Sequence, residues 1–162
     1  MEECNDYKYY YQTKIEDANT SDELFDIAIE ASVKISLSEK GCILLPDDTG
    51  KYMEVKAIYN MDVKSKTFKW GISELEKFYY SEYLIFHNSL DFKQADRDFV
   101  VLNNIKSALI LPLKLADKSL ASIQVYNKKT LYNKDDVYKL KLFLTYILNF
   151  YKNTLKNSDK DK

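Results

Sequence analysis

Apolar residues recur at every second position in two stretches of the chain, and this period is typical of β-strands. The alternating positions are Leu109, Leu111, Leu113 and Leu115 in the first stretch and Ala121, Ile123 and Val125 in the second. A two-residue loop between them would mix core and solvent positions on one face, whereas the three-residue loop 116–118 keeps them apart. The pattern therefore predicts a hairpin in the middle of a sheet, with Leu111 paired to Ile123 and Leu113 to Ala121.

The other face of this hairpin is only partly apolar. It carries Ala108, Ile110 and Pro112 on one strand and Leu120, Ser122, Gln124 and Tyr126 on the other. A mixed face of this kind is suited to line a pocket or to contact a helix. Pro112 has no backbone N–H, so it is expected at an edge, at a bulge or at a position without a ladder bond.

Helical periods dominate the beginning of the chain. A helix over 6–18 is predicted by a narrow apolar stripe of Tyr7, Tyr11, Ile15 and Ala18. A second helix begins at Thr20, with Glu23 in position to complete a capping box, and Gly41 is expected to end this segment. The buried face of the second helix is predicted to hold Leu24, Ile27, Ala28, Ala31 and Ile35.

Two further strands, 42–45 and 52–59, predict a first hairpin around the turn residues 46–50. The region that follows, 60–104, has no clean period at its start. It then predicts a short helix beginning at Ser73, a strand over 83–87, and a loop and helix over 91–104. In the last of these, the residues expected to face the core are Phe99, Leu102 and Ile105.

A long helix is predicted to close the chain. Asn133 is a favourable N-cap, Asp135 and Asp136 occupy the first turn, and the helix should run to about Leu155. Its apolar stripe is Val137, Leu140, Leu144, Ile147, Leu148, Tyr151 and Leu155, with Leu142, Phe143, Tyr146 and Phe150 outside it. One stripe is enough to cover a sheet, so the surplus predicts a second partner. The candidates are the N-terminal helix of the same chain or of a neighbour and a copy of this helix, and a homodimer is favoured.

Composition and charge exclude several classes of function. The chain has 162 residues, enough for one domain, and its net charge of −1 without a basic cluster argues against a nucleic-acid groove. The longest apolar run, 108–113, is far shorter than the roughly 20 residues that span a bilayer, and the polar start is unlike a signal peptide. We expect a cytoplasmic protein without membrane contact, with Cys4 and Cys42 as free thiols.

An enzyme is not indicated. His87 is the only histidine, and it stands in no recognisable catalytic motif. Two distant cysteines and one histidine do not give the spacing of a metal site, and the three glycines form no phosphate-binding loop. No metal is expected, and the sequence does not identify a cofactor.

The order of elements indicates an α+β fold with one antiparallel sheet. The chain resembles the GAF domain family over about residues 20–152. The similar passages are GCILLPDDTGKYMEVKAIYN, SALILPLKLADKSLASIQVYNKKT with its Pro112-Leu113 pair, and NKDDVYKLKLFLTYILNFYKN. The resemblance implies a GAF-like (profilin-like) sheet of five to six strands, with the N- and C-terminal helices on one face and short helices and loops on the other. The expected domains are an N-terminal helix at 1–19, the GAF-like domain at 20–156 and a charged tail at 157–162.

The resemblance also implies a structural ion pair. In the cyclic-nucleotide-binding branch of the family, an Asn-Lys pair and a later Asp-Glu pair tie the last strand to the closing helix. Here Asn127 and Lys128 are followed by Leu131 in place of a Phe, and by Asp135 with Asp136 in place of a Glu. The implied lock joins Lys128 to Asp135, although helix capping also explains Asp135.

GAF domains typically hold small ligands between one sheet face and the irregular segment, which here is 60–104. Carried over to this chain, the pocket candidates are Trp70, Tyr80, Phe86, His87, Asp91, Asp98 and Ser107. Core packing is the simpler explanation of the three aromatic residues. His87 is also explained as a hydrogen-bonded structural residue, Asp91 as a turn residue and Asp98 as part of a solvated helix face.

These expectations combine into a small-molecule-binding sensory domain that acts as a homodimer through its terminal helices and signals through a separate protein partner. The alternative is a ligand-free dimerisation or adaptor domain whose pocket is filled by its own side chains. A weaker alternative is a thiol-dependent enzyme that uses Cys42, and it requires an accessible, stabilised thiolate.

Overall fold

The computed structural model describes residues 2–46, 49, 53–62, 67–68, 83–88, 97–114 and 120–151. The helices are α1 (Glu2–Glu16), α2 (Ser21–Ile35), α4 (Arg97–Leu102) and α5 (Lys134–Phe150). The strands are β1 (Lys40–Pro46), β2 (Met53–Tyr59), β3 (Thr67–Phe68), β4 (Leu84–Phe86), β5 (Ala108–Lys114) and β6 (Leu120–Tyr126). In these residues the strands form one antiparallel sheet of six, in the order β3-β2-β1-β6-β5-β4.

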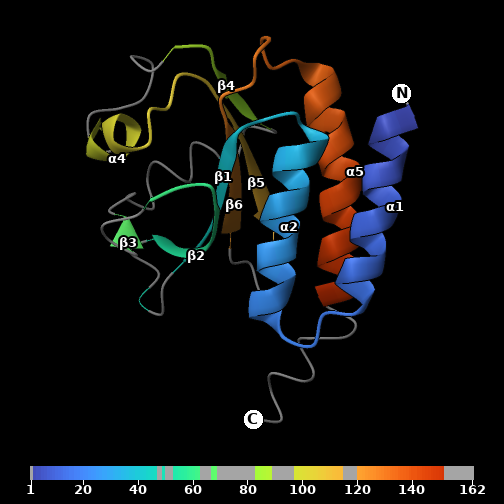
Figure 1. Cartoon of the computed structure of the whole chain (residues 1–162). Helices are drawn as coiled ribbons and strands as arrows, with labels where there is room; N and C mark the ends of the chain where they lie inside the picture. Colours follow the sequence, from blue (N-terminus) through green and yellow to red (C-terminus); the bar gives the residue numbers. More distant parts are fainter. Residues whose placement is uncertain are drawn as a thin grey trace.

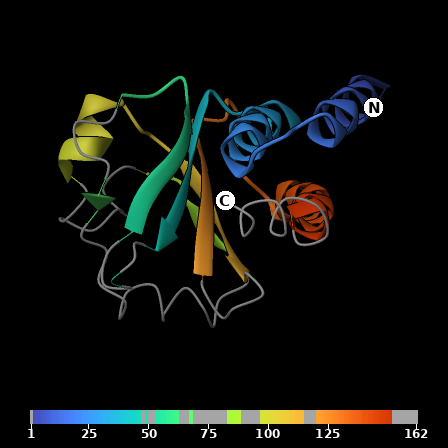
Figure 2. The ribbon, with the colours of Figure 1, turned by 90° about the horizontal axis from the view of Figure 1, so that it is seen from below.

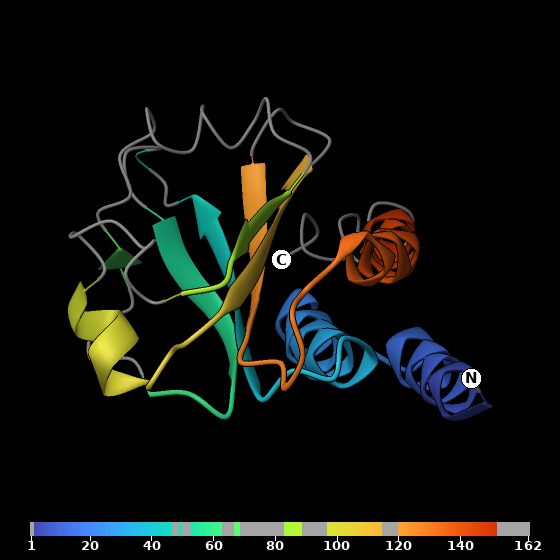
Figure 3. The same cartoon turned by 90° about the horizontal axis from the view of Figure 1, so that it is seen from above.

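The helices divide between the two faces of the sheet. α2 and α5 lie against one face, with α1 outside them, and α4 lies on the opposite side (Figure 1). The views along the helices in Figures 2 and 3 show α1 as the helix farthest from the sheet. The predicted α+β arrangement, with terminal helices on one face and a short helix on the other, is therefore confirmed.

The central hairpin has the register that side-chain parity predicts. Leu111 pairs with Ile123 and Leu113 with Ala121, and both strands are interior because β6 also pairs with β1 and β5 with β4. Pro112 pairs with Ser122 of β6. On its other side, the described pairing of β5 with β4 ends at Ile110, before Pro112. The predicted loop 116–118 lies outside the described residues.

Side chains point alternately to the two faces of the sheet, so the buried residues form two clusters, one on each face. The helix-side cluster includes Leu109, Leu111, Ile123 and Val125 of the central hairpin, packed against α2 and α5. The cluster on the other face, called the pocket-side cluster below, consists of Cys42, Leu44, Met53, Met61, Val100, Ile105, Ala108, Ile110 and Tyr126, with Val55 and Phe86 against it. The sheet is therefore covered on both faces, as its apolar residues require.

The first hairpin is confirmed, but Gly41 lies inside β1 and does not end the helical segment. β1 pairs with β2, with an irregularity between Ile43 and Leu44. α2 ends at Ile35, and its C-terminus closes through bonds from Leu37 N to Lys34 O and from Ser38 N to Val33 O. Leu37 has a φ of 56°, so a leucine takes the left-handed position that usually holds glycine.

Local capping follows the sequence closely. The Thr20 side chain accepts from Glu23 N at 3.2 Å, and the Glu23 carboxylate accepts from Asn19 N at 2.9 Å. The stripe of α1 is buried at Tyr11, Ile15 and Ala18. These contacts set where α2 begins and hold α1 against the layer formed by α2 and α5.

Two core assignments were wrong. Leu102 was expected inside but is 42% exposed, whereas Val100 is buried. The α4 terminus explains this, because Ile105 N bonds back to Val100 O and Asn104 N to Val101 O, a closure that brings Ile105 onto Val100. Phe143 was placed outside the core stripe but is 1% exposed, because the face of α5 toward the sheet and α2 is wider than one stripe.

Some expectations fall outside the described residues. They are the helix beginning at Ser73, the continuation of α5 toward Leu155 and the tail 157–162. Within the described residues, no helix combines the length and the apolar character needed to cross a membrane.

Candidate functional site

A line of hydrogen-bonding side chains lies on the pocket-side face of β6. Ser122, Gln124 and Tyr126 alternate with Ile123 and Val125, and we call these three polar residues the polar row. All three are buried, with exposures of 3%, 2% and 0%. Since β6 is interior to the sheet, the polar row lies near the middle of the face opposite α2 and α5.

The polar row is linked internally. The Tyr126 hydroxyl donates to Gln124 Oε1, and Gln124 Nε2 donates to Ser122 Oγ at 3.3 Å. Cys42 Sγ, on the neighbouring strand, lies 3.5 Å from the Tyr126 hydroxyl. Because the Tyr126 hydrogen is directed to Gln124, the thiol is the natural donor of this pair.

Apolar residues frame the polar row. Leu44 pairs with Ser122 across β1, and Ile110 pairs with Gln124 across β5. Met53 on β2 and Val100 on α4 extend the same pocket-side cluster. Asp136 of α5 is the one charged side chain among the buried residues that the structure describes. It does not belong to the pocket-side cluster, so the described surroundings of the polar row are neutral.

The predicted pocket residues are distributed unevenly. Phe86 is half-buried against the pocket-side cluster, and His87, just after β4, is exposed. Ser107 is half-buried and precedes β5, where its N–H donates to the Asn127 side chain. Asp98 lies in α4, but its side chain is outside the described part of the structure. Trp70, Tyr80 and Asp91 lie entirely outside the described residues.

The mixed face that carries the polar row was predicted to line a pocket or to contact a helix, but none of its three residues was among the predicted site residues. The signal was present, because Ser122, Gln124 and Tyr126 share one face of a strand whose other face is fully apolar. The site residues were sought mainly in the irregular segment, whereas the three residues of the polar row belong to strand β6.

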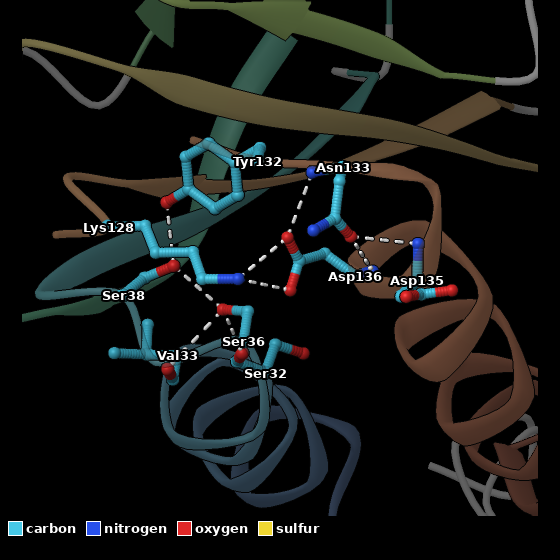
Figure 4. A network of polar contacts seen from close by, with 9 residues as sticks. All are labelled: Ser32, Val33, Ser36, Ser38, Lys128, Tyr132, Asn133, Asp135 and Asp136. Atoms are coloured by element: carbon cyan, nitrogen blue, oxygen red, sulfur yellow. Dashed lines mark hydrogen bonds and ion pairs between the residues drawn. The ribbon is translucent and has the colours of Figure 1, made fainter. Parts of the chain in front are cut away.

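The ion pair between the last strand and the closing helix is present, but its acidic partner is Asp136 and not Asp135 (Figure 4). Lys128 Nζ lies 2.7 and 2.8 Å from the two Asp136 carboxylate oxygens. Asn133 caps the helix, and Asp136, three residues later, turns back to accept from Asn133 N at 3.0 Å. This capping box points the Asp136 side chain toward the preceding connection, whereas Asp135 is exposed.

A hydroxyl chain joins the same connection to the end of α2. Tyr132 Oη lies 2.6 Å from Ser38 Oγ, which lies 2.7 Å from Ser36 Oγ, and Ser36 donates to Ser32 O (Figure 4). Burial raises the pKa of Tyr132 well above its usual range, so the phenol stays protonated and bonded to Ser38. The segment between β6 and α5 is therefore tied to both α2 and α5.

The structure does not support the thiol-dependent alternative. Cys42 is 2% exposed, and its sulfur is packed within the pocket-side cluster. A reactive cysteine needs an accessible thiolate beside a positive charge, whereas Cys42 is buried with its sulfur next to the Tyr126 hydroxyl. No cluster of three or more metal-ligating side chains occurs within the described part of the chain.

Comparison with known proteins places the fold. No protein-family model matches the sequence, and no curated protein matches it. Among solved structures, the GAF domain of a phosphoenolpyruvate-protein phosphotransferase from Coxiella burnetii has a TM-score of 0.70 at 10% identity. That match covers 89% of this chain and 90% of the other.

Other GAF-like structures are equally similar. A fragment of a methyl-accepting chemotaxis protein has a TM-score of 0.69 at 16% identity, covering 90% of this chain and 95% of the other. A far-red absorbing protein in its dark state, with bound biliverdin IXa, has a TM-score of 0.69 at 8% identity, covering 89% and 96%. The chain therefore has the fold of a GAF domain.

Proposed function

We propose that this protein is a sensory domain that binds a small molecule on the pocket-side face of its sheet. The polar row is the observation that carries the proposal, because three neighbouring hydrogen-bonding side chains occupy the centre of an otherwise apolar face. Polar groups in such a position cost free energy unless they are bonded, and binding pockets place a few of them among apolar walls to orient a ligand. The relative with bound biliverdin shows that this fold accommodates a small molecule.

The neutral surroundings indicate the ligand's chemistry at the sheet. Gln124 and Ser122 each offer both donor and acceptor groups, and the described buried residues near them carry no charge. The part of the ligand that meets the polar row is therefore expected to be uncharged and to carry a donor beside an acceptor. Leu44, Ile110 and Phe86 would contact its apolar surface.

A pair of serine variants tests this site. Ser122→Ala removes a hydroxyl from the polar row, and Ser32→Ala removes an equally buried hydroxyl of α2, which donates to Ala28 O. Native mass spectrometry of the wild type is expected to show a bound small molecule that is lost on denaturation. Ser122→Ala should weaken its binding roughly fivefold, the effect of one hydrogen bond, while Ser32→Ala leaves it unchanged.

A ligand-free adaptor is the competing proposal, and the burial of the polar row is the observation that favours it. Side chains that are 0–3% exposed are already covered by the chain itself, and in the adaptor proposal no ligand reaches them. The two proposals differ in one outcome. A bare wild-type mass under native conditions, with Ser122→Ala identical to it, would favour the adaptor.

We also infer that two copies associate through α5 and signal from that surface through a partner protein. Tyr138 and Leu142 are one helical turn apart and 65% and 50% exposed. Tyr146, the next residue of the same stripe, donates to Glu16 of α1 at 3.0 Å, so the stripe leads directly to the α1–α5 contact. An exposed apolar stripe between two terminal helices is suited to a self-complementary interface.

Sedimentation equilibrium measures this association. Leu142→Glu is expected to weaken the dimer roughly tenfold or more, because it places a charge in the apolar contact. Leu37→Glu is the matched control, since Leu37 is 69% exposed but lies at the end of α2. Equal effects of both variants, or a monomeric wild type, would contradict the α5 interface.

A further inference from the structure

The connection between α4 and β5 is held by one asparagine side chain from the end of β6. Asn127 Oδ1 accepts from Lys106 N at 2.7 Å and from Ser107 N at 3.3 Å. Its Nδ2 donates to Asn104 O at 2.9 Å, and its backbone N–H donates to Ser107 O at 3.0 Å. Asn127 is 7% exposed, so these bonds are shielded from water.

This asparagine also has a backbone conformation that few residues adopt. Its φ is 64°, in the left-handed region, which asparagine tolerates better than most residues. The conformation turns the chain sharply at the end of β6 while its side chain reaches back to the α4–β5 connection. The residue therefore has two roles at once, as a turn and as a clamp.

The next residue is the lysine of the buried ion pair. Lys128 binds Asp136, which accepts from the N-cap residue Asn133 and so fixes the start of α5. Two consecutive residues, Asn127 and Lys128, thus contact the α4–β5 connection and the first turn of α5. Asn127 holds the segment that leads from α4 on the pocket side, and Lys128 holds the helix that covers the other face (Figure 1).

A second asparagine strengthens the pocket-side end. Asn103, the residue after α4, is 4% exposed, accepts from Asp62 N at 2.8 Å and donates to Asp62 O at 2.9 Å. Its carbonyl also accepts from Lys40 Nζ at the start of β1. The end of α4 is therefore attached to β1 through Lys40, to the segment after β2 through Asp62, and to the end of β6 through Asn127.

We propose that Asn127 and Lys128 form one clasp that makes the α4–β5 connection and the first turn of α5 open and close together. Displacement of α4 on the pocket side would then reach α5 through two adjacent residues, without passing through the packed sheet. The physical basis is that the two side chains are adjacent in the chain and are each bonded to a different segment, so that release of one removes the position on which the other depends. The proposal concerns the free protein and does not depend on the identity or existence of a ligand.

Residue-resolved hydrogen exchange of the ligand-free protein tests the clasp. Asn127→Gly keeps the left-handed turn and removes the side chain, and Lys128→Met removes the ion pair alone. Each variant is expected to accelerate exchange roughly tenfold at both Lys106 and Val137, relative to Leu111 and Ile123 in the sheet, which report global unfolding. Asn60→Gly is the control, because Asn60 also has a left-handed φ, of 55°, and its side chain donates to Glu39 O, outside the proposed clasp.

The exchange rates distinguish joint opening of the two ends from independent opening. Acceleration at Lys106 alone in Asn127→Gly and at Val137 alone in Lys128→Met would overturn the clasp, because the two ends would then open independently. Should Asn127→Gly fail to fold, Asn127→Asp keeps the acceptor oxygen but replaces the donor to Asn104 O by a carboxylate oxygen, and the same joint acceleration at Lys106 and Val137 is expected. Either result leaves the ligand proposal to its own test.

Discussion

Asp136→Ala is expected to lower the free energy of unfolding by roughly 3 kcal/mol, whereas Asp135→Ala should cost less than about 1 kcal/mol. The Asp136 side chain is 6% exposed and its partner Lys128 is 12% exposed. Removing the carboxylate leaves a nearly buried ammonium group without its anion and takes away the acceptor for Asn133 N. Asp135 is exposed and provides only a negative charge near the N-terminus of α5.

Urea denaturation of the two variants gives the comparison directly. They differ by one position on the same helix turn, so helix propensity and net charge are matched. The double variant Lys128→Met with Asp136→Ala should recover part of the loss, because it removes the unpaired charge. A larger cost for Asp135→Ala than for Asp136→Ala would mean that the lock uses the partner implied by the sequence resemblance.

Gly41→Ala is expected to destabilise the protein by roughly 2 kcal/mol, even though alanine is normally accepted in a strand. A Cβ at this position would lie 2.9 Å from Gln124 O and Val33 Cγ2 and 2.7 Å from Ile29 Cδ1. The two α2 side chains can shift, but the carbonyl of Gln124 belongs to the neighbouring strand β6. The glycine is therefore needed where α2 approaches the sheet most closely.

A relief variant checks the cause of this effect. Ile29→Val removes the nearest methyl group and by itself should cost about 1 kcal/mol. Combined with Gly41→Ala it should cost clearly less than the sum of the two single changes, as measured by thermal and urea unfolding. Additive costs would show that the loss in Gly41→Ala does not arise from contact with α2.

The parts of the fold that were predictable are those fixed by local pattern. A period of two residues sets the register of β5 and β6, because a shift of one would turn Leu111 and Ile123 toward the other face. The N-caps Thr20 and Asn133 were likewise readable, since their partners lie within three residues. Such features need no knowledge of distant contacts.

The features that were not predictable depend on residues far apart in the chain. Gly41 was interpreted as the end of a segment because nothing in sequence indicates how closely α2 approaches β1. The sequence pattern gave no role to Asn103 and placed Asn127 only in the Asn-Lys pair of the implied lock, because their side chains bond partners 41 and 20–23 positions away. The polar row was recognisable as a mixed face, but its burial depends on what covers the sheet.

A crystal structure of the natively purified protein tests the central proposal most directly. We expect electron density for a small molecule within hydrogen-bonding distance of Gln124 or Ser122, with Leu44 and Ile110 against its apolar surface. A pocket-side face covered completely by the chain's own side chains, together with a bare mass under native conditions, would contradict the sensory function and leave an adaptor domain.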